Sequence, residues 1–262
     1  MSNPARIASS VDLPEPEAPT MATASPAVTL SSISRKMTRS LEPLLTVLPM
    51  PRALRIACSL LFMVLGSAAS AAFGETVLVY GDSLSAAYGM PAQRGWVALL
   101  EERIKRERPD YSVANASISG ETTAGGLVRI TKALEQHKPA VVVLELGAND
   151  GLRGLPVTAM KKNLSAMIEQ SQKAGARVLV VGMRMPPNYG PYYANAFERA
   201  FAEVAASHRA ALLPYMMEGF GEKMELFQND RIHPNEKAQA QVLKNVWPAL
   251  EPLLGNKQIK RK

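Results

Sequence analysis

The sequence predicts an α/β protein, a three-layer α/β/α sandwich around a five-stranded parallel sheet. From residue 75 onward, strand-like and helix-like stretches alternate along the chain, as they do in successive β-α-β units. The third strand-like run, residues 140–146, is apolar at nearly every position, which indicates a strand buried on both faces. The helix-like stretches have apolar residues at intervals of three and four, as at Leu164, Met167 and Ile168, and this spacing is typical of helices that pack on a sheet.

The expected elements follow one another in alternation. We expect strands over residues 76–80, 112–116, 140–146, 177–182 and 211–213. We expect helices over residues 94–108, 123–137, 156–174, 192–208 and 234–253. Ligands of such folds bind at the carboxyl ends of the strands, so the residues that follow each strand are the candidates for a functional site.

The end of the first strand carries the most informative stretch of the chain. The apolar run 77–80 breaks at Gly81 and then presents Asp82 and Ser83. A sharp turn here would lift the Ser83 hydroxyl clear of the sheet, so Ser83 is a candidate nucleophile. Residues 84–87 contain no Pro or Gly, and a helix that begins there would direct its N-terminal amides at Ser83. The alternative is that Asp82 or Ser83 only caps that helix.

A glycine and an amide follow the next two strands. Gly120 comes after the second strand, where a glycine lets the backbone approach a ligand and point its N–H inward. Asn149 comes after the third strand, and its side-chain amide could donate a hydrogen bond into the same crevice. Taken alone, each is better explained as part of an ordinary turn.

The loop before the last predicted helix carries Asp230 and His233, three residues apart. At this spacing the carboxylate can turn toward the imidazole, fix its tautomer and support its positive charge. The chain has two other histidines, His137 and His208, and both are expected at helix ends rather than after strands. His233 is therefore the candidate general base, and its alternative is a capping histidine in a loop.

Together these motifs resemble the four sequence blocks of the SGNH hydrolases, also called GDSL esterases. More narrowly, the chain is similar to the bacterial periplasmic thioesterase/lysophospholipase (arylesterase) members of that family. The resemblance runs from about residue 75 to about residue 254, with the blocks in the right order and spacing. The blocks are Gly81–Ser85, Gly120, Glu145–Gly154 and Asp230–Pro234.

The resemblance implies a flavodoxin-like fold and a serine hydrolase that needs neither metal nor cofactor. It implies that Ser83 is the nucleophile, His233 the general base and acid, and Asp230 the orienting carboxylate. It also implies an oxyanion hole made of the Ser83 and Gly120 backbone N–H groups and the Asn149 side chain. One position departs from the family: the residue after Asp230 is often glycine there, and here it is Arg231. Its cation could compete with His233 for the Asp230 carboxylate.

The implied reaction is hydrolysis of an acyl ester or thioester, such as an acyl-CoA, an aryl ester or a lysophospholipid, through an acyl-enzyme. Residues 183–193, rich in Met, Pro and Tyr, are expected to form part of an apolar acyl pocket, although a structural Pro-rich turn explains them equally well. Two alternatives are a carbohydrate or peptidoglycan O-acetyl esterase with the same triad and a non-enzymatic exported binding module. The intact Ser83 and His233 argue against the binding module.

The hydrolase domain is predicted to span residues 73–256, after a leader. Residues 1–49 are rich in Pro, Ser, Ala and Thr without periodicity, which indicates a disordered extension or a mis-assigned start. Residues 50–72 have a basic beginning, an apolar core and a small-residue end, as a cleavable signal peptide does. The apolar core is too short to span a membrane.

A signal peptide at this position makes Met50 an alternative translation start. Its cleavage would leave an exported form that begins between Ala71 and Phe73, in the periplasm or outside the cell. The only cysteine, Cys58, lies inside the predicted signal peptide, so the exported form would have neither disulfides nor thiolate metal sites.

The distribution of charged residues along the chain indicates which kinds of partner the protein can bind. The formal net charge is +7, and most of it falls outside residues 73–256, partly in the basic tail 257–262. A nearly neutral domain excludes a nucleic-acid surface, and we expect a monomer that binds small molecules. The tail is expected to be a solvated end, with a transient contact with anionic membrane lipid as the alternative.

Overall fold

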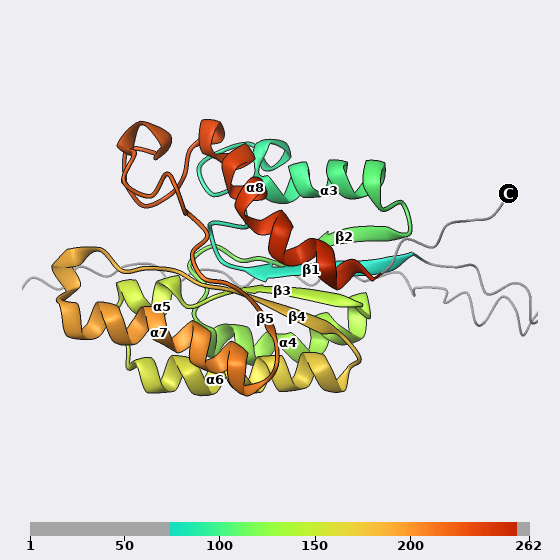
Figure 1. The fold of residues 1–262 in the computed structure, drawn as a ribbon, viewed down its shortest axis with the longest axis horizontal. Coiled ribbons are helices and arrows are strands. Elements are labelled where there is room, and N and C mark those ends of the chain that lie inside the picture. Colours follow the sequence, from blue (N-terminus) through green and yellow to red (C-terminus); the bar gives the residue numbers. More distant parts are fainter. Residues whose placement is uncertain (1–73, 256–262) are drawn as a thin grey trace, which may run out of the picture. The chain divides into compact units, whose positions relative to one another are not determined.

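The computed structural model describes residues 74–255 of the chain (Figure 1). The predicted extension 1–49, the predicted signal peptide 50–72 and the basic tail 257–262 lie outside the described residues.

The central sheet has five parallel strands, as predicted. They are β1 (Glu75–Gly81), β2 (Tyr111–Asn115), β3 (Val141–Glu145), β4 (Arg177–Val181) and β5 (Ala211–Leu213). Their order in the sheet is β2-β1-β3-β4-β5. Val79 of β1 pairs with Asn115 of β2, and Gly81 of β1 pairs with Glu145 of β3. The carboxyl ends of these three strands therefore lie side by side at one end of the sheet.

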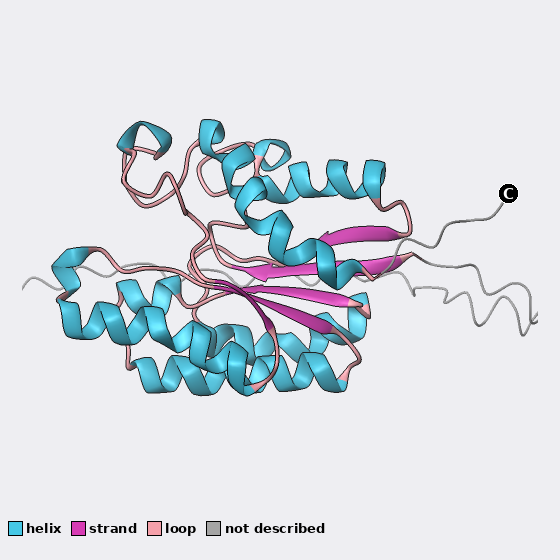
Figure 2. Cartoon of the chain, viewed as in Figure 1, coloured by secondary structure: helices cyan, strands magenta, loops and turns pink. Residues whose placement is uncertain are grey.

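Helices cover both faces of the sheet (Figures 1 and 2). On one face, α3 (Trp96–Glu107) packs against α8 (Gln239–Leu250). On the other face lie α4 (Thr123–His137), α6 (Val157–Lys173) and α7 (Pro191–Ser207). The expected three-layer α/β/α architecture is confirmed, and the first four predicted helices agree with the observed bounds to within two residues.

The last predicted helix, 234–253, is wrong in its bounds. A 3-10 turn, Glu236–Ala238, precedes α8, and a second one, Glu251–Leu254, follows it. The Asn235 side chain accepts a hydrogen bond from Lys237 N at 3.0 Å and caps the first turn, which separates it from the loop before it. A short helix, α5 (Ala148–Leu152), occupies the stretch that was expected to be a turn after the third strand.

The structure also contradicts the possibility that a helix begins directly after Ser83. Residues 83–89 form hydrogen-bonded turns instead: Ala86 N donates to Asp82 O at 2.9 Å, and Tyr88 N donates to Ser83 O at 3.1 Å. Ala87 takes a left-handed backbone conformation, with φ at 57°, and this ends the right-handed winding after one turn. Because residues 83–89 do not continue as a helix, no helix dipole begins at Ser83, and charge near its hydroxyl must be stabilised by individual donors.

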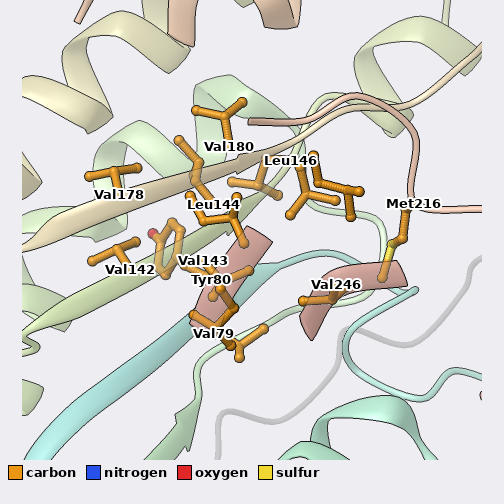
Figure 3. Packing of buried hydrophobic residues seen from close by; sticks show 14 of the residues in the cluster. Val79, Tyr80, Val142, Val143, Leu144, Leu146, Val178, Val180, Met216 and Val246 are labelled. Carbon is orange, nitrogen blue, oxygen red and sulfur yellow. The ribbon is translucent and has the colours of Figure 1, made fainter. Parts of the chain in front are cut away.

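Apolar side chains from the strands form the core (Figure 3). Residues 77–80 of β1 are fully buried, and Figure 3 shows Tyr80 among valines of β3 and β4. The Tyr80 hydroxyl donates to Gly126 O at 2.7 Å, which ties α4 to the sheet, and burial raises the pKa of Tyr80 to about 12. Within residues 74–255, none of the helices has the length and apolarity that a membrane span requires.

Candidate active site

Ser83 lies two residues beyond the end of β1, on a turn that buried groups hold in place. Asp82 N donates to Glu145 Oε2 at 3.3 Å, and Asp82 Oδ1 accepts from Leu84 N at 3.1 Å. A Cβ atom at Gly81 would clash with the Glu145 carboxylate and would lie 2.8 Å from Ser85 Oγ, so only glycine fits where the strand ends. The turn leaves Ser83 half-buried, with its hydroxyl facing a cavity.

Ser83, His233 and Asp230 form a continuous chain of hydrogen bonds. His233 Nε2 lies 2.8 Å from Ser83 Oγ, and His233 Nδ1 lies 2.7 Å from Asp230 Oδ2. Because a carboxylate can only accept, Nδ1 carries the proton, and Nε2 is left as the acceptor for the serine hydroxyl. The three residues that the sequence singled out are therefore brought together, from the two ends of the domain.

The Asp230 carboxylate receives three donors. Asp230 Oδ1 accepts from Ile232 N at 2.9 Å and from His233 N at 3.0 Å, in addition to the bond from the imidazole. Partial burial favours the neutral acid, but the backbone N–H groups of His233 and Ile232 and the His233 side chain outweigh it and hold the pKa of Asp230 below its ordinary value. Arg231 is not among the donors, so the competition considered from the sequence does not occur in this structure.

Tyr88, which is not among the residues predicted from the sequence, contacts the imidazole of His233 with its ring. The two ring centroids lie 4.7 Å apart at an interplanar angle of 41°. Gln228 Nε2 donates to Tyr88 O at 2.8 Å, and Gln228 N donates to His233 O at 2.8 Å, so one residue joins the turn after Ser83 to the His233 loop. A tyrosine in a turn carries no sequence signal for this role, because the contact joins segments 145 residues apart.

Gly120 and Asn149 line the same cavity as Ser83. Gly120 lies between β2 and α4 with φ at 79°, in the left-handed region that favours glycine, and its carbonyl accepts from Arg153 Nη2 at 2.9 Å. Among residues 74–255, neither the Ser83 nor the Gly120 backbone N–H has a protein acceptor. Both amides are therefore free to bind a ligand oxygen.

Asn149 lies in the first turn of α5, and Asp82 holds its side chain. Asn149 Nδ2 donates to Asp82 Oδ2 at 3.0 Å. A side-chain amide has two N–H donors, so one remains for the cavity. The next residue, Asp150, accepts from Thr123 N at 2.8 Å and so attaches α5 to the beginning of α4.

Two buried carboxyl groups lie behind the turn at Ser83. Ser85 Oγ donates to Glu145 Oε2 at 2.7 Å, whereas Glu145 Oε1 is buried without a partner among the described residues. Burial, with the charge of Asp82 beside it, raises the pKa of Glu145 well above its ordinary value. Burial likewise raises the pKa of Asp82 to about 6, against the hydrogen bonds from Leu84 and Asn149. Neither residue was a candidate catalytic or oxyanion-hole group from the sequence.

The cavity has a volume of about 1190 Å³. Of the predicted pocket segment 183–193, residues 183–186 line it, but Tyr189 and Tyr193 do not. Their hydroxyls donate to Leu152 O at 2.9 Å and to Leu155 O at 2.8 Å, which fixes the segment against the end of α5. The second half of that prediction is therefore wrong.

Many other lining residues come from the connection between β5 and α8, residues 214–238, of which the sequence singled out only the block Asp230–Pro234. Its apolar residues in the cavity are Met217, Met224, Phe220, Phe227 and Ile232. His137 and His208 do not line the cavity.

Comparison of the sequence and comparison of the fold with known proteins identify the same family. The model of the GDSL-like Lipase/Acylhydrolase family matches residues 79–241. Esterase TesA of Pseudomonas aeruginosa is 48% identical over 203 residues, which cover 78% of this chain and all of the relative. Thioesterase 1/protease 1/lysophospholipase L1 of Escherichia coli K12 is 39% identical over 75% of this chain and 92% of its own. A crystal structure of TesA superposes with a TM-score of 0.67 at 50% identity, covering 68% of this chain and 99% of that one.

Proposed function

This chain belongs to the GDSL-like lipase/acylhydrolase family, the SGNH hydrolases, and from that premise we propose that Ser83, His233 and Asp230 are its catalytic triad. The chain is a serine esterase that hydrolyses ester and thioester bonds. The observation that carries the residue assignment is the unbroken relay from Ser83 Oγ through the imidazole to Asp230, at 2.8 Å and 2.7 Å.

The relay accounts for each proton transfer. His233 Nε2 takes the proton of Ser83 as Oγ attacks the carbonyl carbon, and ionised Asp230 stabilises the imidazolium that forms. The tetrahedral intermediate then collapses, and His233 returns the proton to the leaving oxygen or sulfur. Water repeats the same steps on the acyl-enzyme and releases the acid and the free serine.

The negative charge of each tetrahedral intermediate needs donors beside Ser83. We assign this part to the Ser83 and Gly120 backbone N–H groups and the second N–H of Asn149. Their presence in one cavity, and the lack of acceptors for both backbone groups among the described residues, support the assignment.

The substrate is proposed to carry an acyl chain of medium or greater length. The cavity has apolar walls, which include Leu152, Met183, Met185 and Phe220. The alternative, an O-acetyl esterase, is less well supported because neither an acetyl group nor a sugar needs the apolar side chains that Met183, Met185 and Phe220 present to the cavity. Comparing kcat/KM for octanoyl and acetyl esters of one alcohol decides between them, and a preference for acetyl would favour the O-acetyl esterase.

An alkyl phosphonate tests the nucleophile directly. We expect the reagent to inactivate the enzyme and to modify Ser83, as mapped by peptide mass spectrometry. Ser83→Ala should abolish labelling, whereas the control Ser119→Ala, at another serine of the cavity wall, should keep it. Labelling of any other serine in the wild type would contradict the triad.

We also propose that the enzyme is exported through residues 50–72 and acts as a monomer. The basic, apolar and small-residue regions of that segment support export, and the monomer is supported by a cavity to which one chain supplies the whole relay. N-terminal sequencing of the periplasmic protein should find a start between Ala71 and Phe73, and light scattering should find the mass of one chain. An uncleaved product in the inner membrane would overturn the export proposal.

A further inference from the structure

Arg231 has a backbone conformation that arginine rarely adopts. Its φ is 59°, in the left-handed region, where the Cβ atom of any L-residue is crowded. The turn demands this conformation: Asp230 Oδ1 collects the N–H groups of Ile232 and His233, and Arg231 N donates to Gln228 O at 2.9 Å. Glycine would fit here without strain, yet the position holds a long cation.

The Arg231 guanidinium has no protein partner within residues 74–255. Its neighbour Asp230 is already bonded to two backbone N–H groups and the imidazole. The other arginine of the cavity wall, Arg184, differs in this respect, because it pairs with Glu198 at 2.8 Å and stacks over the ring of Tyr215. The positive charge of Arg231 is therefore available to a ligand in the cavity.

Arg231 lies close in the chain to the imidazole that protonates the leaving group, and it lines the same cavity. His233 returns its proton to the leaving oxygen or sulfur, so that group must lie against the imidazole. Arg231 is two residues from His233 and lines the same cavity. Glu218, which also lines the cavity, lies 3.5 Å from Arg184 Nη1. Lys223 and Glu222 line it as well, but their opposite charges are adjacent in the chain and offset each other.

We propose that Arg231 forms an anion subsite for the leaving group, and that the enzyme prefers esters and thioesters whose alcohol or thiol carries a phosphate. Guanidinium presents paired N–H donors that match two phosphate oxygens. This inference rests on the proposed function, because it takes His233 as the acid that protonates the leaving group.

Two matched pairs of substrates test the subsite. Octanoyl-CoA and octanoyl-pantetheine share the acyl chain and the thioester, and only the first carries phosphates. A monoacylglycerol phosphate and the monoacylglycerol of the same chain length repeat the comparison for an oxygen ester. The measured quantity is kcat/KM for the substrate that carries phosphate, divided by kcat/KM for its partner without phosphate. It is measured for the wild type, Arg231→Gln and Arg231→Lys.

Arg209→Gln is the matched control. Arg209 also has a left-handed backbone, with φ at 52°, but it lies between α7 and β5 and does not line the cavity. Its replacement should leave both ratios unchanged and so separates the effect of the subsite from that of changing a strained arginine.

Arg231→Gln should lower the ratio about tenfold in at least one pair, as expected when a charge-assisted bond to phosphate is lost, and Arg231→Lys should restore part of it. A fall in the CoA pair alone identifies the nucleotide phosphates as the ligand, and a fall in the glycerol pair alone identifies a lipid headgroup. Ratios that stay within twofold of the wild type in both pairs overturn the subsite. A wild-type enzyme that hydrolyses none of the four substrates overturns the proposed function instead.

Discussion

Asp82 Oδ2 accepts a hydrogen bond of 3.0 Å from Asn149 Nδ2, so the residue before the nucleophile holds an amide that lines the same cavity. Asp82 is fully buried, and its other oxygen accepts from Leu84 N within the Ser83 turn. One carboxyl group thereby orients both the nucleophile turn and the proposed oxyanion donor.

Asn149→Ala should lower kcat by about two to three orders of magnitude, or roughly 3 kcal/mol, with little change in KM, because an oxyanion donor acts mainly in the transition state. Steady-state kinetics on an octanoyl ester measure this. Ser119→Ala, at a cavity residue outside the proposed machinery, serves as the control. A rise in KM with unchanged kcat would place Asn149 in ground-state binding instead.

Asp82→Asn should also lower kcat, because asparagine has a single carbonyl oxygen for the two donors, Leu84 N and Asn149 Nδ2. In a double-mutant cycle with Asn149→Ala, the two losses should be less than additive, since Asp82 acts partly through Asn149. Fully additive losses would show that the contact between Asp82 and Asn149 does not matter for catalysis. Thermal unfolding of each variant checks that the fold is kept.

Ser83→Ala and His233→Ala should each lower kcat more than Asn149→Ala does. The double variant should be scarcely worse than either single one, because without the nucleophile there is no proton for His233 to take. Residual rates of the three proteins on one substrate give the comparison. Additive losses would mean that the two residues do not share a step.

Asp230→Asn should reduce kcat nearly as far as His233→Ala, because the intact Asp230–His233 hydrogen bond fixes the tautomer. Arg231→Gly should not raise the activity, since Arg231 does not draw the carboxylate away. If Asp230→Asn lowers kcat only slightly while Arg231→Gly raises it, Arg231 competes with His233 for the Asp230 carboxylate in solution. The hydrogen bond between Asp230 and His233 is then weaker than its geometry indicates.

Glu145→Gln should stabilise the protein increasingly as the pH rises. Burial raises the folded-state pKa of Glu145 above its unfolded value, so the folded state holds the proton more tightly. Below about pH 4, Glu145 is protonated in both the folded and the unfolded protein, so it does not make the stability depend on pH. As the pH rises from there, the free energy of unfolding falls because the unfolded protein releases this proton first. Glutamine mimics the neutral acid and removes this decline.

The measurement for Glu145 is the difference in Tm between the variant and the wild type, taken from pH 4 to pH 8. Glu135→Gln, at an exposed position of α4, is the control for the loss of a carboxylate away from the site. A difference for Glu145→Gln that stays constant with pH would contradict the raised pKa of Glu145.

The sequence alone determined the fold class and the identity of the relay residues. The alternation of strand-like and helix-like stretches, with the apolar run 140–146, specified a parallel sheet covered on both faces, because burial of a strand on two faces leaves no polar alternation. Ser83, Gly120 and Asn149 each follow a strand, and the carboxyl ends of parallel strands meet at one end of a sheet, so their convergence could be predicted from their positions.

Only the tertiary structure decided the groups that act through contacts distant in sequence. The contact of the Tyr88 ring with His233, the hydrogen bond from Asn149 to Asp82 and the hydrogen bond from Asp82 N to Glu145 depend on strand register and side-chain packing, and a local pattern does not encode these. The turn after Ser83 is a further example: residues 84–87 have no helix breaker, so the sequence allows a helix there, yet the backbone follows its hydrogen bonds to Glu145 and Gln228 instead. Local propensity determines which conformations a segment can adopt at a low cost in free energy, whereas the packing of the whole domain selects among them.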